Sequence, residues 1–162
     1  MSGTPRQLSV SWQEYLTPEA MPETDQILLR EAQAALEKAY APYSHFRVGA
    51  AIRLANGEVL SGGNVENAAY PMCLCAERVV LGAAASLYPE VPITAMAITV
   101  QNERQLIDRP GAPCGACRQV MVETEGRFGQ DFPVILRGQT GPIIRLAKAK
   151  DLLPLYFDGT FL

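Results

Sequence analysis

The sequence predicts a single α/β domain, and three observations lead to this fold class. The chain has 162 residues, of which 48% are hydrophobic and 19% charged, which is typical of one globular domain with a sizeable core. Short apolar runs of strand type alternate with helical patterns along the chain. No internal repeat and no linker divides the sequence, so one domain accounts for the whole pattern.

The first helix is expected to begin at Thr24. Residues 1–24 have no sustained periodicity and form an N-terminal extension, while residues 25–162 form the predicted domain. Ala41-Pro42 is expected to end the helix, because a residue before proline avoids the α region. Thr24 is a candidate N-cap. The apolar stripe of this helix consists of Leu28, Ala32, Ala35, Leu36 and Ala39.

A β-hairpin follows the first helix. Residues 46–55 form the expected first strand, Asn56-Gly57 is a strong hairpin-turn signal, and residues 58–63 form the return strand. Helices and strands then alternate along the rest of the chain. We expect helices at about 75–87 and 114–124, strands at 93–100, 132–136 and 143–146, and a short element containing Leu152, Leu153 and Leu155.

The charge distribution disfavours a nucleic-acid partner. The formal net charge is −3, with 6 basic and 9 acidic residues in the first half and 8 of each in the second. No apolar run approaches the ~18 residues of a membrane span. The N-terminal residues also lack the pattern of a secretory signal. We therefore expect a cytoplasmic protein, in which the four cysteines are thiols or metal ligands rather than disulfides.

Two short motifs carry the chemistry of the sequence. Cys75-Ala76-Glu77 begins one predicted helix, and Pro113-Cys114-Gly115-Ala116-Cys117 begins another. Two cysteines separated by two residues can bind one metal ion, and a third leaves the fourth tetrahedral position open, as in a catalytic zinc site. A helix N-terminus favours the thiolate form. Glu77 lies in the same first turn as Cys75, where a carboxylate can exchange protons with a bound water.

Other interpretations of these residues stay open at this point. Cys114 and Cys117 could form a redox pair, although the thioredoxin-like context is absent. Cys73 could join the other three cysteines in a closed, structural four-thiolate site, although its single-residue separation from Cys75 is awkward for that purpose. We rank Cys73 as a buried bystander and His45, the single histidine, as a turn residue.

Taken together, the motifs resemble the short, zinc-dependent, homotetrameric cytidine deaminases. The characteristic pattern is a first ligand, one residue, a glutamate and then P-C-x-x-C, with a three-cysteine variant. The resemblance covers about residues 25–160 and implies a three-layer α/β/α fold with a mixed five-stranded sheet. It is carried by C-A-E (75–77), P-C-G-A-C-R-Q (113–119), AYAPYSHFRVGAA (39–51), GGNVENAAYPMCLCAER (62–78) and DLLPLYF (151–157).

The resemblance also implies roles for individual residues. One Zn²⁺ per chain is bound by Cys75, Cys114 and Cys117, and Glu77 carries protons. Arg78 and Arg118 match two arginines of the family that donate hydrogen bonds to the zinc thiolates. In the substrate site, Asn64 and Glu66 bind the ribose 3′-hydroxyl, while Phe46 stacks near the pyrimidine. The backbone at Ala76 helps to read the base, Tyr70 lies in the substrate loop, and Phe157 enters the site of a neighbouring subunit.

The implied activity is hydrolytic deamination of cytidine and 2′-deoxycytidine, in pyrimidine salvage, by a homotetramer. Three alternatives remain. The VVLGAAA stretch after Glu77 resembles a deaminase of blasticidin S, whereas Glu66 and the NVENAAY loop favour a nucleoside with a free ribose. A deaminase of RNA or DNA is disfavoured by the acidic balance. The last alternative is a non-catalytic zinc module built on all four cysteines.

Overall fold

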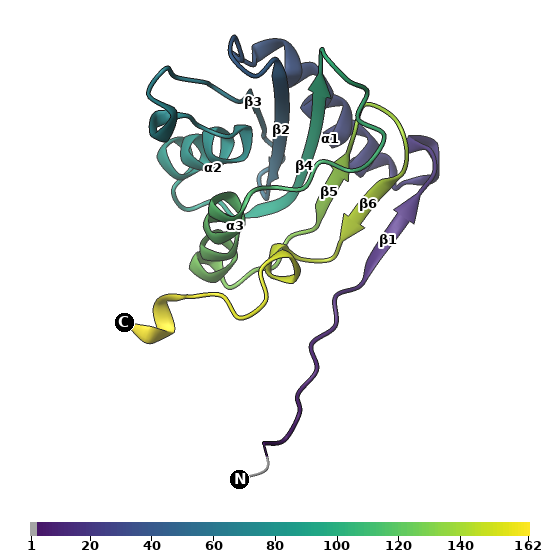
Figure 1. Ribbon diagram of the computed structural model, residues 1–162. Coiled ribbons are helices and arrows are strands. Elements are labelled where there is room, and N and C mark those ends of the chain that lie inside the picture. The colour runs from purple at the N-terminus through teal and green to yellow at the C-terminus, as the bar shows by residue number, and fades with distance from the viewer. Residues whose placement is uncertain (1–2) are drawn as a thin grey trace.

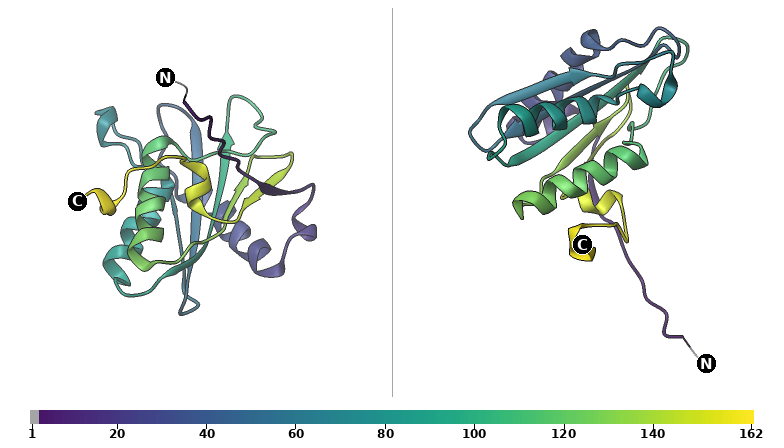
Figure 2. Two further views of the ribbon diagram at one scale, coloured as in Figure 1. Left: turned by 90° about the horizontal axis from the view of Figure 1, so that it is seen from below. Right: turned by 90° about the vertical axis from the view of Figure 1, so that its left-hand side faces the viewer.

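A mixed sheet of six strands forms the middle layer of the molecule (Figure 1). The computed structural model describes residues 3–162. Helix α1 (Glu23–Ala34) covers one face of the sheet, while α2 (Ala76–Leu87) and α3 (Gly115–Phe128) cover the other (Figure 2, left). The predicted three-layer α/β/α fold is therefore confirmed.

The strand order across the sheet is β1-β6-β5-β4-β2-β3. Only the β4–β5 pair is parallel, and all other neighbours are antiparallel. The predicted hairpin joins β2 to β3 through Asn56 and Gly57, where Gly57 has a φ of 91° and the Asn56 side chain accepts the Glu58 amide. The strands are β1 (Trp12–Tyr15), β2 (Phe46–Leu54), β3 (Val59–Gly63), β4 (Ile93–Asn102), β5 (Val134–Arg137) and β6 (Ile143–Leu146).

The sheet has one strand more than the five expected from the sequence. Strand β1 pairs antiparallel with β6, from Trp12 opposite Leu146 to Tyr15 opposite Ile143. It lies within the N-terminal extension, which therefore contributes an edge strand rather than only a tail. Residues 3–11 have no regular secondary structure and extend away from the body of the molecule (Figure 1).

The boundaries of two helices differ from the sequence expectation. Helix α1 begins at Glu23 with Pro22 in the N-cap position, so Thr24 lies inside its first turn and is not its cap. A 3-10 turn at Ala35–Lys38 follows α1. Helix α3 continues four residues beyond the expected end. It ends only at Gly129, which adopts the left-handed conformation common after helix C-termini.

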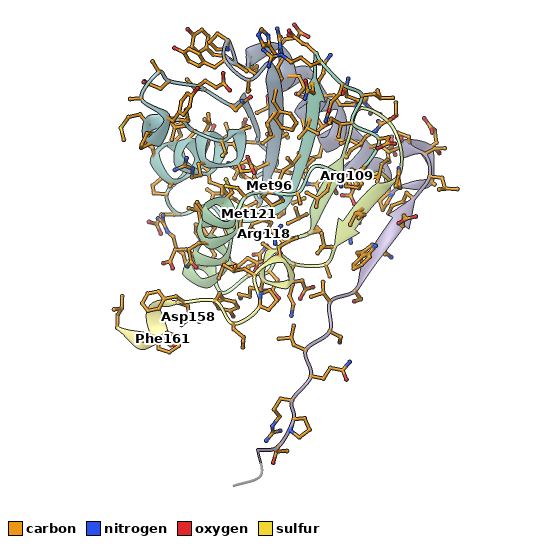
Figure 3. All side chains as sticks on the ribbon, viewed as in Figure 1. Met96, Arg109, Arg118, Met121, Asp158 and Phe161 are labelled. Atoms are coloured by element: carbon orange, nitrogen blue, oxygen red, sulfur yellow. The ribbon has the colours of Figure 1, made fainter. Side chains whose placement is uncertain are left out.

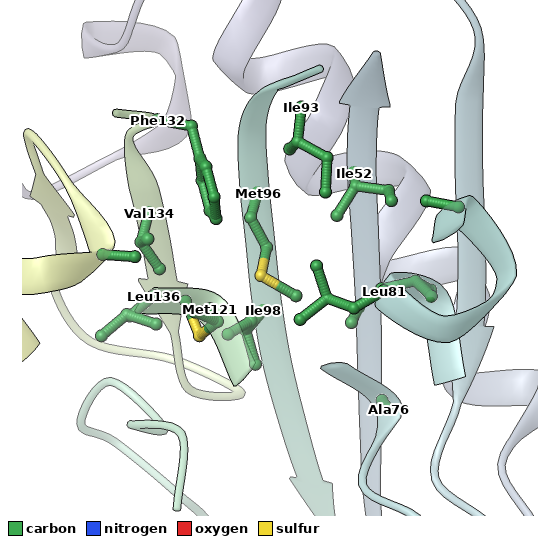
Figure 4. Close-up of a cluster of buried hydrophobic side chains, with 14 of the residues drawn as sticks. Ile52, Ala76, Leu81, Ile93, Met96, Ile98, Met121, Phe132, Val134 and Leu136 are labelled. Carbon is green, nitrogen blue, oxygen red and sulfur yellow. The ribbon is translucent and has the colours of Figure 1, made fainter. Parts of the chain in front are cut away.

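The core consists of two apolar layers on the two faces of the sheet. On one face, Met96 and Ile98 of β4 lie among Leu81 of α2, Met121 of α3 and Phe132 (Figure 4). The second layer lies beneath α1 and is formed by Leu28, Leu29, Ala32, Ala51, Ala97 and Ile135, among others. Burial on both faces fixes β4 as the central strand and holds α2 and α3 against it. Within residues 3–162, no helix is both long and apolar enough to span a membrane.

Candidate active site and metal centre

Three cysteine thiols meet where helices α2 and α3 begin. Cys75 is the N-cap of α2, Cys114 is the N-cap of α3, and Cys117 is buried in the first turn of α3. The Sγ atoms of Cys75 and Cys114 are 3.8 Å apart, and those of Cys114 and Cys117 are 3.3 Å apart. All three sulfurs lie within 4.8 Å of one another. The structure thus brings together the three predicted ligands.

The geometry and the chemistry of this cluster fit a zinc ion. Zn–S bonds of about 2.3 Å in a tetrahedral site place the sulfurs about 3.8 Å apart, which is close to the separations found here. Thiolates are ligands that zinc prefers. Three protein ligands leave one tetrahedral position for a water or a substrate, as in catalytic rather than structural zinc sites.

The surroundings of the sulfurs favour ionisation at Cys75. The hydrogen bond from Cys117, with that from Cys114 and the nearby Arg78 guanidinium, lowers the pKa of the Cys75 thiol to about 5. Sharing a hydrogen bond with Cys75, together with burial, raises the pKa of Cys117 instead. A bound cation would favour the thiolate form of Cys117, which its surroundings alone disfavour.

Glu77 lies in the first turn of α2, two residues after Cys75, and is only 3% exposed. Burial raises the pKa of its carboxyl group above the ordinary range of a glutamate. Its Oε2 atom is buried and has no hydrogen-bond partner among residues 3–162. An unpartnered buried carboxylate oxygen is costly unless a ligand or a bound water satisfies it. This oxygen therefore marks a place for a polar ligand beside the sulfurs.

The two arginines predicted to neutralise the thiolates have different contacts. Arg78 donates from Nη2 to the Cys73 carbonyl at 2.8 Å and contributes to the low pKa of Cys75. Arg118 donates from Nε to the Pro113 carbonyl and from Nη1 to the Leu152 carbonyl, both at 2.8 Å. Figure 3 shows Arg118 between α3 and the C-terminal segment. Arg118 thus ties the loop that carries Cys114 to that segment.

A cavity of about 470 Å³ opens beside the cysteine cluster. Its volume is in the range of small-molecule sites. The lining unites β2, the loop after β3, and the starts of α2 and α3, which are far apart in the sequence. The predicted site residues that line it are Phe46, Asn64, Glu66, Cys75, Glu77 and Cys114.

Asn64 and Glu66 are held by backbone groups. Asn64 accepts the Val48 amide at 2.8 Å and donates to the Phe46 carbonyl at 3.0 Å. Glu66 accepts the Tyr43 and Ser44 amides through Oε2, at 2.8 and 3.3 Å. Within residues 3–162, these bonds do not use the second N–H of Asn64 or the Oε1 atom of Glu66. A donor and an acceptor side by side suit a hydroxyl group.

Besides Arg78 and Arg118, four predicted site residues do not line the cavity of their own chain. Ala76 is fully buried at the start of α2, directly between Cys75 and Glu77. Tyr70 is 69% exposed, with its ring edge-on to Tyr43. Phe157 is 56% exposed and stacks on Phe161 in the C-terminal segment. Cys117 is fully buried, and its sulfur belongs to the same cluster as those of Cys75 and Cys114.

The sequence does not identify several residues that complete the cavity wall. Val48, Ile98 and Val100 line it, yet in the sequence they have the pattern of ordinary core strands. Gly111 also lines it, and a Cβ at this position would lie 2.5 Å from a Val100 methyl group. For these residues the sequence offered one signal, which is a glycine two residues before the P-C-x-x-C motif. Cys73 lines the cavity as well, although its thiol bonds the backbone of Asn67.

Comparison with known proteins identifies the family. Residues 22–128 match the family described as "Cytidine and deoxycytidylate deaminase zinc-binding region". A cytidine deaminase of Halalkalibacterium halodurans is 48% identical over 134 residues, which is 83% of this chain and 94% of that protein. The chain belongs to the cytidine deaminase family.

Other members of the cytidine deaminase family agree in sequence and in fold. The Mycobacterium tuberculosis cytidine deaminase is 41% identical over 83% of this chain and 97% of its own length. The crystal structure of the Burkholderia pseudomallei cytidine deaminase superposes with a TM-score of 0.69 and 42% identity, covering 85% of this chain and all of that one. The predicted deaminase fold and the three-cysteine zinc site are therefore confirmed.

Proposed function

We propose that this protein hydrolyses cytidine, and also 2′-deoxycytidine, to the uracil nucleoside and ammonia. The observation that carries the proposal is the unpartnered Oε2 atom of Glu77, buried in the same cavity as the cysteine cluster. A carboxylate in that position serves proton transfer, and the three thiols supply a catalytic type of zinc site. Neither feature is needed for a purely structural metal site.

Cys75, Cys114 and Cys117 would hold the zinc ion, which would lower the pKa of a water and so provide a nucleophile at neutral pH. Glu77 accepts the proton released by that water and donates it to N3 of the cytosine ring as C4 is attacked. Glu77 then takes the proton of the new C4 hydroxyl group and delivers it to the amine, so that the C4–N bond breaks and the C4 carbonyl forms. Burial around Glu77 favours the protonated carboxyl, which suits a group that must hold a proton between two steps. Water and cytidine thus yield uridine and ammonia.

We propose that the cavity binds the nucleoside by its pyrimidine base and by its ribose. The ring of Phe46 forms a platform near the pyrimidine, and the backbone at Ala76, beside Glu77, helps to read the base. The free N–H of Asn64 and the free Oε1 of Glu66 bind the 3′-hydroxyl, which can accept from one and donate to the other. This half-buried pair favours a free ribose over blasticidin S, because a ligand without that hydroxyl leaves both groups without a partner.

The arginines are proposed to moderate the charge of the zinc site. Three thiolates on Zn²⁺ carry a formal charge of −1, which weakens acidification of the bound water. Arg78, beside Cys75, withdraws charge from that sulfur. Arg118 is proposed to act less directly, because its hydrogen bond to the Pro113 carbonyl holds the loop that carries Cys114.

We further propose a homotetramer in which neighbouring subunits complete each site. Large apolar side chains are exposed in the segment between β3 and α2 and in the C-terminal segment, among them Tyr70 (69%), Met72 (63%), Phe157 (56%) and Phe161 (68%). Apolar surface of this extent is typical of subunit contacts. Phe157 is proposed to enter a neighbour's cavity, and Tyr70 to lie in the same contact. Four free thiols support a reducing compartment such as the cytoplasm, where the reaction would serve pyrimidine salvage.

A spectrophotometric assay tests the function directly. Purified, zinc-loaded protein is mixed separately with cytidine, 2′-deoxycytidine and blasticidin S, and loss of absorbance near the cytidine maximum is followed with ammonia release. We expect turnover of both nucleosides and little or none of blasticidin S. Preferential turnover of blasticidin S would support that alternative, and inactivity of zinc-loaded protein on all three would contradict the proposal. Chelation should abolish activity, and added Zn²⁺ should restore it.

A further inference from the structure

Glu103 binds the residues on both sides of Phe46. It follows the end of β4, one position beyond Asn102, which pairs with Phe46 in β2. Its Oε2 lies 3.1 Å from Nδ1 of His45, and its Oε1 accepts from Nε of Arg47 at 3.2 Å and lies 3.1 Å from Nη2. The Glu103 amide also donates to the His45 carbonyl at 3.2 Å. Phe46 is therefore held between two residues that share one carboxylate.

His45 has a backbone conformation that needs such support. Its φ is 56°, in the left-handed region that residues with a Cβ atom rarely adopt. A residue stays in that region only where the surrounding structure holds it. The His45 amide donates to the Ala41 carbonyl at 3.1 Å and closes the turn, while Glu103 holds the carbonyl and the ring of the same residue.

The turn at 41–45 also holds the substrate-binding carboxylate. Glu66 accepts the amides of Tyr43 and Ser44, and the Phe46 amide donates to the Ser44 hydroxyl at 3.0 Å. Ser44, Phe46 and Glu66 all line the cavity. A displacement of the turn would therefore move the aromatic ring and the Glu66 carboxylate together.

We propose that Glu103 is a positioning residue for nucleoside binding, which fixes Phe46 and the 41–45 turn against Glu66 by holding His45 and Arg47. The inference rests on the proposed function, because the ligand concerned is the nucleoside. Glu103 forms no hydrogen bond with Glu77 or with the three zinc ligands in the described part of the chain. Its effect is therefore on substrate binding and not on the chemical step.

The test compares steady-state kinetics of zinc-loaded Glu103→Ala, Glu103→Gln and His45→Asn with the wild type on cytidine. For Glu103→Ala we expect KM to rise about 5- to 10-fold, with kcat within about twofold, since two exposed charged contacts are lost. Glu103→Gln keeps one acceptor oxygen and should recover part of the KM. His45→Asn keeps a residue that tolerates the left-handed region and should raise KM by a smaller factor than Glu103→Ala. Zinc content should stay at one per chain.

Glu90→Ala is the matched control and should leave KM and kcat unchanged. Glu90 is an exposed glutamate in the α2–β4 loop and forms no ion pair within residues 3–162. If the wild type is active and Glu103→Ala has an unchanged KM, this inference alone is overturned. It is also overturned if kcat of Glu103→Ala falls by as large a factor as KM rises. A zinc-loaded wild type that does not deaminate cytidine would overturn the proposed function instead. If Glu103→Ala does not fold, Glu103→Gln and His45→Asn provide the same KM test.

Discussion

At the scale of single residues, Glu77 and the cysteines are distinguished by what surrounds them and not by their residue type. Glu77 is one of the buried polar side chains of the chain, with Asp25, Thr99 and Glu125. Asp25 accepts from Arg145 at 2.7 Å, and Glu125 accepts backbone amides. Only Glu77 among the two buried glutamates has an oxygen without a partner, within residues 3–162. Partnered carboxylates stabilise the fold, whereas an unpartnered one beside a metal site is available to a ligand.

Replacing Glu77 by glutamine tests its role in proton transfer. The amide keeps the size of the side chain but cannot accept and return a proton, so kcat should fall by about 10²- to 10⁴-fold. Zinc content should be unchanged, because Glu77 is not one of the three sulfur ligands. Turnover near the wild-type rate, with zinc bound, would rule out Glu77 as the proton carrier.

Serine substitutions separate the three zinc ligands from Cys73. Cys73 hydrogen-bonds the Asn67 backbone through its sulfur and is not part of the 4.8 Å cluster. We therefore expect Cys73→Ser to retain one zinc per chain, and Cys75→Ser or Cys117→Ser to lose most of it, as measured by atomic emission on protein purified without chelators. Loss of zinc from Cys73→Ser would instead support a four-thiolate site.

At the scale of elements, the loop before Cys114 approaches β4 closely, and this approach depends on Gly111. A Cβ there would meet both methyl groups of Val100, at 2.5 and 2.8 Å, and a valine side chain cannot swing away. Gly111→Ala should displace the loop or the strand, at a cost of about 1–3 kcal/mol, and should lower both zinc occupancy and activity. Gly115→Ala is the control, because a Cβ at Gly115 meets nothing within 4 Å. Equal behaviour of the two variants would show that the approach is not tight.

Glu125 fixes the C-terminal segment to α3. It is fully buried and accepts the amides of Phe132 (3.0 Å), Ala149 (2.7 Å) and Lys150 (3.0 Å). Glu125→Ala leaves these donors without a partner and should lower the free energy of unfolding by about 1–3 kcal/mol. Urea unfolding at one protein concentration measures this, with exposed Glu123→Ala of the same helix as control. We expect Glu125→Gln to lie between them, and a Glu125→Ala stability matching that of Glu123→Ala would refute the anchoring role.

Several turns, strands and helix starts could be predicted because their signals lie within a few residues. The Asn56-Gly57 turn, the strand at 143–146 and the two helix starts at Cys75 and Cys114 carry their own signals. Strand β1 was not predicted, because Trp12–Tyr15 is short and its partner β6 lies about 130 residues further along the chain. The Glu103–His45 contact depends on the register between β2 and β4, which no local pattern specifies.

At the scale of the whole molecule, the C-terminal aromatic residue Phe157 does not line the cavity of its own chain. The segment after η4 (Ala149–Leu152) lies against α3, where Gln119 donates to the Phe157 carbonyl at 2.8 Å. The Phe157 ring stays 56% exposed beside Phe161, at the end of the molecule marked by Phe161 in Figure 3. Phe157 and Phe161 are thus exposed apolar side chains outside the core, as the proposed contact with a neighbouring subunit requires.

Complementation between two inactive variants tests whether Phe157 serves a neighbouring subunit. Glu77→Gln chains keep Phe157 but cannot transfer protons, whereas Phe157→Ala chains keep Glu77 but lack the aromatic. In mixed tetramers, a Phe157→Ala chain receives Phe157 from a Glu77→Gln neighbour, so unfolding and refolding the two variants together should give more activity than either alone. If Phe157 acts within its own chain, no mixed site is complete and mixing gives no gain. Light scattering during size-exclusion chromatography supplies the oligomeric state, and full activity at monomer mass would contradict the shared site.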